Sequence, residues 1–206
     1  MSIALLVIAK EPLAGSAKTR LCPPCSPGEA ASLAGAALLD TLDVVARTPA
    51  DRKVLVFEGD PRGWRREGLE VIAQRGAGLG ERLAAAFEDV AGPALLVGMD
   101  TPQLTPALLL EGMRALRDPG CDAVLGPALD GGYWSVGLKA PNRAVFEGIP
   151  MSVASTLRWQ RRRLRELGLR AHEQTVLRDI DTIADARAVA VQAPDSRFAA
   201  ALASMR

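Results

Sequence analysis

The chain has 206 residues, of which 49% are hydrophobic, 4% aromatic and 24% charged, and its formal net charge is +1. This length fits one α/β domain, which we expect to cover residues 1–206 around an aliphatic core. The near-neutral charge argues against a nucleic-acid partner or an acidic membrane surface, and no stretch reaches the roughly 18 apolar residues of a membrane span. We expect a cytoplasmic protein, because no secretory signal is recognisable and three cysteines, an odd number, suit a reducing compartment.

Apolar runs bounded by turn residues predict strands that alternate with helices. Strands are expected at residues 3–9, 53–57, 70–73, 94–97, 123–125, 133–138 and 169–173. Helices are expected at residues 27–47, 81–90, 106–117, 153–168, 183–191 and 196–204, the first opened by a capping box at Ser26 and the fourth capped by Ser152. The alternation predicts an α/β fold, a three-layer α/β/α sandwich with a mixed, mostly parallel sheet of about seven strands.

The strand expected at residues 94–97 delivers an acid at its carboxyl end. Gly98 and Asp100 follow the apolar run, and Thr101-Pro102 ends it. Ligands of open α/β sheets bind at the carboxyl ends of the strands, and a carboxylate there can hold a hard cation. Asp100 is therefore a candidate metal ligand. The local sequence leaves an Asx turn or a helix cap equally open.

The loop after the first strand is a candidate phosphate site. It brings Lys10, Lys18 and Arg20 together with Gly15 at the carboxyl end of that strand. Flexible backbone and several cations suit a phosphate, because amides and positive charge must converge on its oxygens. The P-loop pattern is absent, since Lys18-Thr19 follows Gly15 without a second glycine. A solvated basic loop is the alternative.

Near the end of the chain, Asp179 and Asp181 flank Ile180. The two acids point the same way if the segment is extended, and they could then complete an oxygen cage with Asp100. The alternative is a helix cap, because Thr182 directly precedes an expected helix.

A glycine pair lies in the stretch Asp130-Gly131-Gly132-Tyr133-Trp134. Two glycines allow the backbone to approach a ligand closely, and two of the chain's eight aromatic residues follow at once. An Asp-Gly hairpin turn is the alternative, and it explains the glycines but not the adjacent aromatic pair.

Other features carry less chemistry. The glycines of residues 76–80 lack the spacing of a dinucleotide-binding loop, so we expect them to pass a base edge, with Gln74 as the polar reader. Cys22 and Cys25 have the spacing of a redox pair, but the helix cap at Ser26 follows both, so neither begins a helix that would lower its pKa. One histidine and no G-x-S-x-G motif argue against a Ser–His–Asp hydrolase.

Taken together, these motifs resemble those of the GT-A-like nucleotide-diphospho-sugar transferase superfamily. The motifs cover nearly the whole chain in order, at residues 9–21, 78–83, 98–106, 126–134 and 179–182. Within the superfamily, the chain is similar to a small bacterial family of uncharacterised glycosyltransferases found beside radical-SAM and arsenosugar-type genes. The first and third motifs are also similar to those of the 2-phospholactate guanylyltransferases, which are nucleotidyltransferases of the same Rossmann-like fold.

The resemblance implies a role for each matching residue. The nucleotide would be bound by Lys10, Gly15, Lys18, Arg20, Gln74 and Gly78. Asp100 and Asp181 would hold Mg²⁺ or Mn²⁺, and the acceptor would lie against Gly131, Gly132 and Tyr133. Asp100, Lys18 and Asp130 would serve catalysis, with Asp130 as the candidate base.

The resemblance leaves the type of transfer open. Sugar nucleotidyltransferases usually start the first loop with Gly-Gly and carry a later Pro-x-Lys, whereas this chain reads Ala-Lys-Glu-Pro and has no lysine between Lys18 and Lys53. Glycosyltransferases often carry Asp-x-Asp where this chain has Met99-Asp100. We therefore expect a metal-dependent transferase that uses a nucleotide-sugar donor and a small acceptor, with nucleotidyl transfer to a phosphorylated acceptor as the alternative. A non-catalytic nucleotide-binding module is the alternative of another class, and the oligomeric state stays open.

Overall fold

The computed structural model describes residues 2–205 and contains a seven-stranded sheet. The strands follow the order β3-β2-β1-β4-β6-β5-β7 across the sheet. Their bounds are β1 Ala4–Lys10, β2 Arg52–Glu58, β3 Glu70–Ala73, β4 Ala94–Val97, β5 Ala123–Pro127, β6 Tyr133–Leu138 and β7 Ala171–Glu173. β6 runs antiparallel to its neighbours β4 and β5, and all other neighbours pair in parallel. The expected fold class is confirmed.

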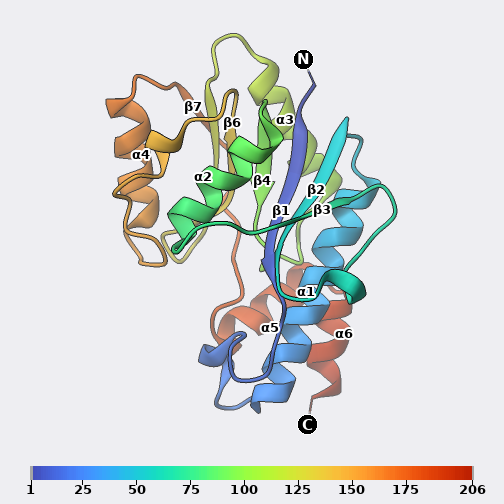
Figure 1. Ribbon diagram of the computed structural model, residues 1–206. Helices are drawn as coiled ribbons and strands as arrows, with labels where there is room; N and C mark the ends of the chain where they lie inside the picture. The colour runs from blue at the N-terminus through green and yellow to red at the C-terminus, as the bar shows by residue number, and fades with distance from the viewer. Residues whose placement is uncertain (1, 206) are drawn as a thin grey trace.

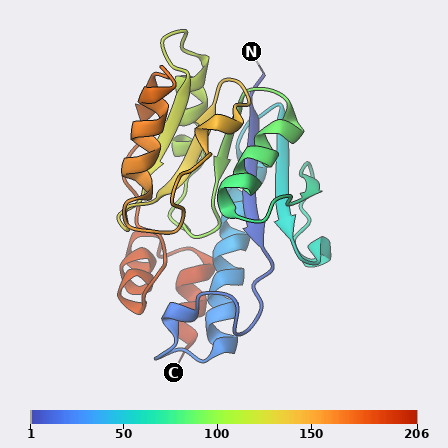
Figure 2. The same ribbon diagram turned by 60° about the vertical axis from the view of Figure 1, so that its left-hand side comes forward.

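Helices cover both faces of this sheet (Figures 1 and 2). The bounds are α1 Pro27–Arg47, α2 Leu79–Val90, α3 Pro106–Arg117, α4 Thr156–Glu166, α5 Ile183–Gln192 and α6 Arg197–Ser204. The capping box expected at Ser26 is present, and it fixes the start of α1. None of the helices described is both long and apolar enough to span a membrane.

Side chains alternate between the two faces of each strand, so every central strand serves two cores. On one face, Leu5 and Val7 of β1 pack with Leu38 of α1 and Met113 of α3. On the other face, Leu6 packs in a cluster that includes side chains of α2 and α4. This double burial explains why the central strands read as continuous apolar runs rather than as alternating ones.

A third core lies beyond the carboxyl edge of the sheet, where α1 extends past the strands and meets α5 and α6 (Figures 1 and 2). Leu33, Val189 and Phe198, one from each of these helices, are fully buried there. Ile180, from the segment before α5, joins the same core and is 1% exposed. The C-terminal segment that carries the two late acids is therefore tied to the start of the chain.

The fourth helix begins later than the sequence predicts, at Thr156 rather than at residue 153. Ser152 adopts a left-handed backbone conformation (φ 60°) and does not cap the helix. The reason is the hydroxyl of Thr156, which lies 2.8 Å from the carbonyl oxygens of Pro150 and Val153 and holds the preceding residues in a closed loop. Residues 151–153 thereby line a cavity instead of a helix face.

Asp40 holds α6 onto α1. It is 8% exposed, and its carboxylate accepts the backbone N–H groups of Arg197 at 3.0 Å and Phe198 at 2.9 Å. We predict that Asp40→Ala lowers the free energy of unfolding by about 1–3 kcal/mol, because one buried and one partly buried N–H donor lose their acceptor. Urea unfolding would measure the loss.

Glu67→Gln is the control for that prediction, because Glu67 is exposed and its change should stay within about 0.5 kcal/mol. Equal effects from the two variants would show that the Asp40 carboxylate does not stabilise the C-terminal helix.

Candidate functional site

Asp100 lies just beyond the carboxyl end of β4 and is held by a lysine from the loop after β1. Lys18 Nζ lies 2.8 Å from Asp100 Oδ2 and also donates to the carbonyl oxygen of Ile180. The backbone N–H of Ile180 in turn donates to the carbonyl oxygen of Asp100 at 3.1 Å. Three segments that are far apart in the sequence therefore meet at one point.

Lys18 adopts a left-handed backbone conformation (φ 50°), which is costly for a residue with a side chain. The side chain is only 13% exposed, and its two acceptors hold the ammonium in place. Strained residues that the surroundings hold in this way cluster at functional sites. The strain therefore favours a functional role for Lys18 over the alternative of a solvated basic loop.

The basic loop and the C-terminal segment line a cavity of about 260 Å³, which we call the basic cavity. Its charged lining residues are Lys10, Lys18, Arg20, Asp100 and Asp181. Arg20 pairs with Asp181, and Lys18 pairs with Asp100. The cations predicted to bind phosphate thus converge on one space. Gly15 (φ +81°) permits the turn between Lys10 and Lys18 but does not line the cavity.

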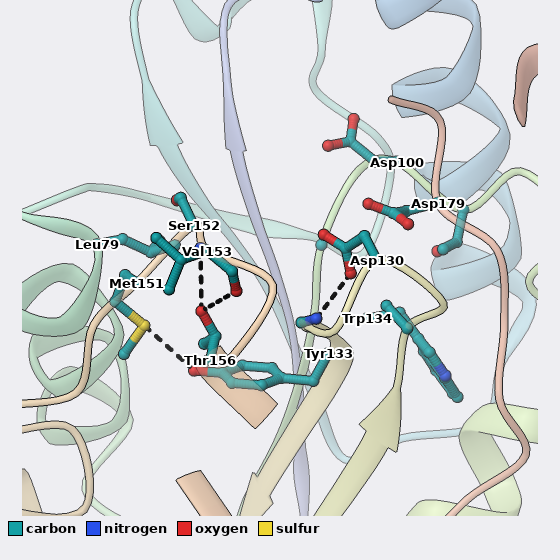
Figure 3. A pocket seen from close by; sticks show the side chains of 14 residues that line it. Leu79, Asp100, Asp130, Tyr133, Trp134, Met151, Ser152, Val153, Thr156 and Asp179 are labelled. Atoms are coloured by element: carbon teal, nitrogen blue, oxygen red, sulfur yellow. Dashed lines mark hydrogen bonds between the residues drawn. The ribbon is translucent and has the colours of Figure 1, made fainter. Parts of the chain in front are cut away.

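A second cavity, of about 170 Å³, opens beside the first, and we call it the acidic cavity (Figure 3). Asp100, Asp130 and Asp179 line it, together with the apolar surfaces of Tyr133 and Met151. Asp100 lines both cavities. The two acids that flank Ile180 line different cavities, because Asp181 belongs to the basic one and Asp179 to the acidic one.

The surroundings of Asp179 disfavour its charge. Its pKa is raised from 3.8 to about 6, first because the carboxyl is withdrawn from water and second because Asp130 lies nearby. Asp100 adds to the rise, and the ammonium of Lys18 opposes it. Within residues 2–205, neither Asp130 nor Asp179 forms a salt bridge. The acidic cavity therefore carries negative charge that its own walls do not balance.

Asp130 lies within the hairpin turn between β5 and β6. Its Oδ1 accepts the backbone N–H of Gly132 at 2.7 Å, as in an Asx turn (Figure 3). Gly131 has φ +89°, and a Cβ atom there would lie 2.0 Å from the carbonyl oxygen of Ala154. The hairpin alternative therefore holds, and Gly131 allows the loop before α4 to close over the turn. Of the three residues assigned to the acceptor, Gly132 and Tyr133 line the acidic cavity and Gly131 does not.

The aromatic pair after the turn divides between two tasks. Trp134 is buried, and its indole N–H donates to the carbonyl oxygen of Thr175 at 3.1 Å, which fastens the C-terminal segment to β6. The hydroxyl of Tyr133 lies 3.4 Å from Gln160 Oε1 beneath Met151, and burial raises its pKa. Tyr133 thus stays protonated and shapes the cavity wall.

A third cavity, of about 450 Å³, lies along the ends of β1 and β2, and we call it the central cavity. Lys10, Glu58, Gln74, Arg82 and Asp100 supply its charged and amide groups. Gln74 differs from the expectation of a base reader. Its amide nitrogen donates to the carbonyl oxygens of Ala9 and Val56, and its Oε1 accepts from Arg82. It ties strands together, because its position between two strand ends satisfies both backbone groups.

Gly78, like Gly15, lines none of these three cavities. It precedes α2 as the N-cap residue and lines a separate surface hollow with Phe146 and Met151.

The surroundings of Cys25 do not suit a redox site. Cys25 is buried, and that burial raises the pKa of its thiol, the opposite of what a thiolate nucleophile needs.

The donor set suits a metal ion that its substrate helps to bind. In the part of the chain that the structure describes, no three His, Cys, Asp or Glu side chains are arranged to hold an ion by themselves. Mg²⁺ and similar hard cations are nevertheless commonly held by one or two carboxylates together with substrate phosphates. Asp100 and Asp181 line the same cavity as the three cations and fit that pattern.

The sequence does not predict that the loop before α4 lines a cavity. Met151 and Val153 line the acidic cavity, but apolar residues at such spacing predict a buried helix face equally well. Thr101 is a second omission. It lines the acidic cavity beside Asp100, and its buried hydroxyl has no hydrogen-bond partner among residues 2–205.

The fold is that of the nucleotide-diphospho-sugar transferases. A candidate nucleotide-diphospho-sugar transferase from Desulfovibrio desulfuricans G20 is 27% identical, with a TM-score of 0.87 over 98% of this chain and 95% of that chain. CMP:2-keto-3-deoxy-manno-octonic acid synthetase, solved with CTP, is 13% identical, with a TM-score of 0.60 over 95% of this chain and all of that chain.

Glucosyl-3-phosphoglycerate synthase from Mycobacterium tuberculosis, solved with Mn²⁺, UDP and glucosyl-3-phosphoglycerate, is 11% identical. Its TM-score is 0.57 over all of this chain and 81% of that chain. No curated protein matches the sequence. Residues 33–153 match the bacterial family described as uncharacterised proteins conserved in bacteria, DUF2064, and the chain belongs to that family.

The raised pKa of Asp179 predicts a pH-dependent penalty on stability. The folded state binds this proton more tightly than the unfolded state, so the penalty grows as the pH rises from about 4 to about 6 and is complete above that. Asp179→Asn should therefore stabilise the protein by about 1–3 kcal/mol at pH 7 and have no such benefit near pH 4. Denaturant unfolding in EDTA at both pH values would measure it, with Glu67→Gln as the control. A gain that is the same at both pH values would contradict the electrostatic cause.

Proposed function

We propose that this protein is a metal-dependent transferase that moves a glycosyl group from a nucleotide sugar to a small acceptor. The single domain would act in the cytoplasm. The observation that carries the proposal is the position of Asp100, which lines the basic, acidic and central cavities at once. A donor with its phosphates in the basic cavity would present its sugar to an acceptor in the acidic cavity.

The cations of the first loop would hold the donor. Lys18 and Arg20 would exchange their carboxylate partners for phosphate oxygens, and Lys10 lies on the wall of both the basic and the central cavity. The nucleoside would extend into the central cavity past Leu79 and Arg82. Mg²⁺ or Mn²⁺, held by Asp100 and Asp181, would neutralise charge on the diphosphate leaving group.

Asp130 would accept the proton of the acceptor hydroxyl. One of its oxygens is held by Gly132, which fixes the orientation of the carboxylate. As the acceptor oxygen bonds to the anomeric carbon, the bond from that carbon to the diphosphate breaks. The nucleoside diphosphate leaves with the electron pair, and the proton passes to Asp130. Lys18 supplies fixed positive charge beside the departing oxygens.

Nucleotidyl transfer is the alternative, supported by the likeness of the first and third motifs to those of 2-phospholactate guanylyltransferases and by the nucleotidyltransferase fold of the CTP-bound neighbour. In that reaction an acceptor phosphate attacks the α-phosphorus and pyrophosphate leaves. Product analysis separates the two, since only glycosyl transfer releases a nucleoside diphosphate.

The first prediction of the proposal concerns Asp100. A panel of nucleotide sugars and nucleoside triphosphates, each with and without Mn²⁺, should contain a ligand that raises the melting temperature only with the metal. Asp100→Asn should abolish the Mn²⁺-dependent part of that rise, because the carboxylate that links metal and donor is lost. Asp195→Asn, an exposed acid between α5 and α6, is the matched control. A full Mn²⁺-dependent rise in Asp100→Asn would sink the metal role.

Removing the ammonium of Lys18 should change nucleotide binding and metal binding in opposite directions. Lys18→Met should weaken binding of the nucleotide with Mn²⁺ at least about tenfold, because a fixed charge on the phosphates is lost. It should strengthen binding of Mn²⁺ alone, because Asp100 no longer pairs with an ammonium. Titration calorimetry with and without nucleotide would measure both. A loss in both titrations would point to local unfolding instead.

A further inference from the structure

The acidic cavity has no cationic side chain to attract an anion. Its fourteen lining residues include three aspartates but no lysine, arginine or histidine. The three cations of the first loop line the basic cavity instead, where they would meet the donor phosphates. Proteins bind phosphate and carboxylate groups with cations or with converging free backbone N–H groups, so the walls must offer one or the other.

Three of the backbone N–H groups around this cavity already have acceptors. Around the cavity, the N–H of Gly98 donates to the carbonyl oxygen of Trp134, and the N–H of Gly132 donates to Asp130. The N–H of Val153 donates to the hydroxyl of Thr156. These three amides are already occupied, so they form no anion-binding nest.

The same walls favour another kind of ligand. Leu79, Tyr133, Met151 and Val153 offer apolar surface on one side (Figure 3). Asp130 and Asp179 lie on the other side and can accept hydrogen bonds from hydroxyl or ammonium groups. Thr101 is only 2% exposed, and its hydroxyl, which has no hydrogen-bond partner among residues 2–205, is one more polar group at this wall.

We propose that the acidic cavity takes a small hydroxyl-bearing acceptor that is uncharged or positively charged and has an apolar face, and that it excludes phosphorylated and carboxylated acceptors. This inference rests on the proposed glycosyl transfer, because that reaction is what makes the bound molecule an acceptor. It departs from the glucosyl-3-phosphoglycerate synthase neighbour, which was solved with a phosphorylated product. The cavity volume of about 170 Å³ limits the acceptor to a small molecule.

The first test compares matched acceptors. With the donor found in the thermal panel and Mn²⁺, release of nucleoside diphosphate is measured with glycerol against glycerol 3-phosphate, methyl glucoside against glucose 6-phosphate, and ethanolamine against phosphoethanolamine. The unphosphorylated member of each pair should accelerate release at least about tenfold more, because like charges repel in a partly desolvated site. Faster release with the phosphorylated members would overturn the inference.

The second test needs no donor and measures the electrostatic potential of the cavity directly. Val153 lies at its rim and is 45% exposed, so Val153→Cys should place a reactive thiol there without disturbing the core. Its rates of labelling by a positively and a negatively charged methanethiosulfonate are compared. Val191→Cys, on the exposed face of α5 and 81% exposed, gives the reference ratio, and peptide mass analysis separates the new thiol from the half-buried Cys22.

The ratio of cationic to anionic labelling should be at least about fivefold higher at position 153 than at position 191, and high salt should reduce it. Adding Asp130→Asn to Val153→Cys should also lower it. A preference for the anionic reagent at position 153 overturns the inference whatever the donor result. A cationic preference in a protein that binds none of the nucleotide ligands with Mn²⁺ means that the proposed function fails while the cavity chemistry stands.

Discussion

The burial of Ile180 is the constraint on which the site depends. This side chain fills the core between α1, α5 and α6, and its backbone N–H and C=O bond to Asp100 and Lys18 respectively. The C-terminal segment is thereby drawn across the carboxyl edge of the sheet. Gln103 holds the same segment two residues before Ile180, because it donates to the carbonyl oxygen of Arg178. Without this crossing, the late acids would have no fixed relation to the loop after β1.

That crossing also separates charge. Asp181 remains with the cations of the first loop, and Asp179 lies with Asp130 on the far side of Asp100. On the basic side, each acid has a cationic partner. On the acidic side, neither Asp130 nor Asp179 has such a partner within residues 2–205, and burial together with the nearby Asp130 raises the pKa of Asp179. Walls of different sign suit a site that takes an anionic donor on one side and an uncharged or cationic acceptor on the other, because the donor is steered to the basic side.

Much of this arrangement could be predicted from the sequence. Residues 94–97 and 133–138 are strands with the expected bounds. The first is apolar throughout because it is buried on both faces, and it ends where polarity returns. The convergence of Lys18 with Asp100 follows from the rule that strand ends share an edge. The division of Asp179 from Asp181 could not be predicted, since it depends on the path of a segment fixed by distant contacts. The position of Met151 and Val153 in a cavity wall could not be predicted either. The hydroxyl of Thr156, rather than local helix propensity, decides where α4 begins.

The charge of the acidic cavity bears on the type of transfer as well. Nucleotidyl transfer requires an anionic acceptor to approach the α-phosphorus of a triphosphate, so two groups of the same sign must be brought together. Enzymes overcome that repulsion with cations on both reactants, whereas here the three cations all line the donor side. Glycosyl transfer to a hydroxyl makes no such demand: it requires a base, and a carboxylate held by Gly132 meets that need. The distribution of charge around Asp100 thus favours glycosyl transfer on physical grounds that are independent of any likeness to other proteins.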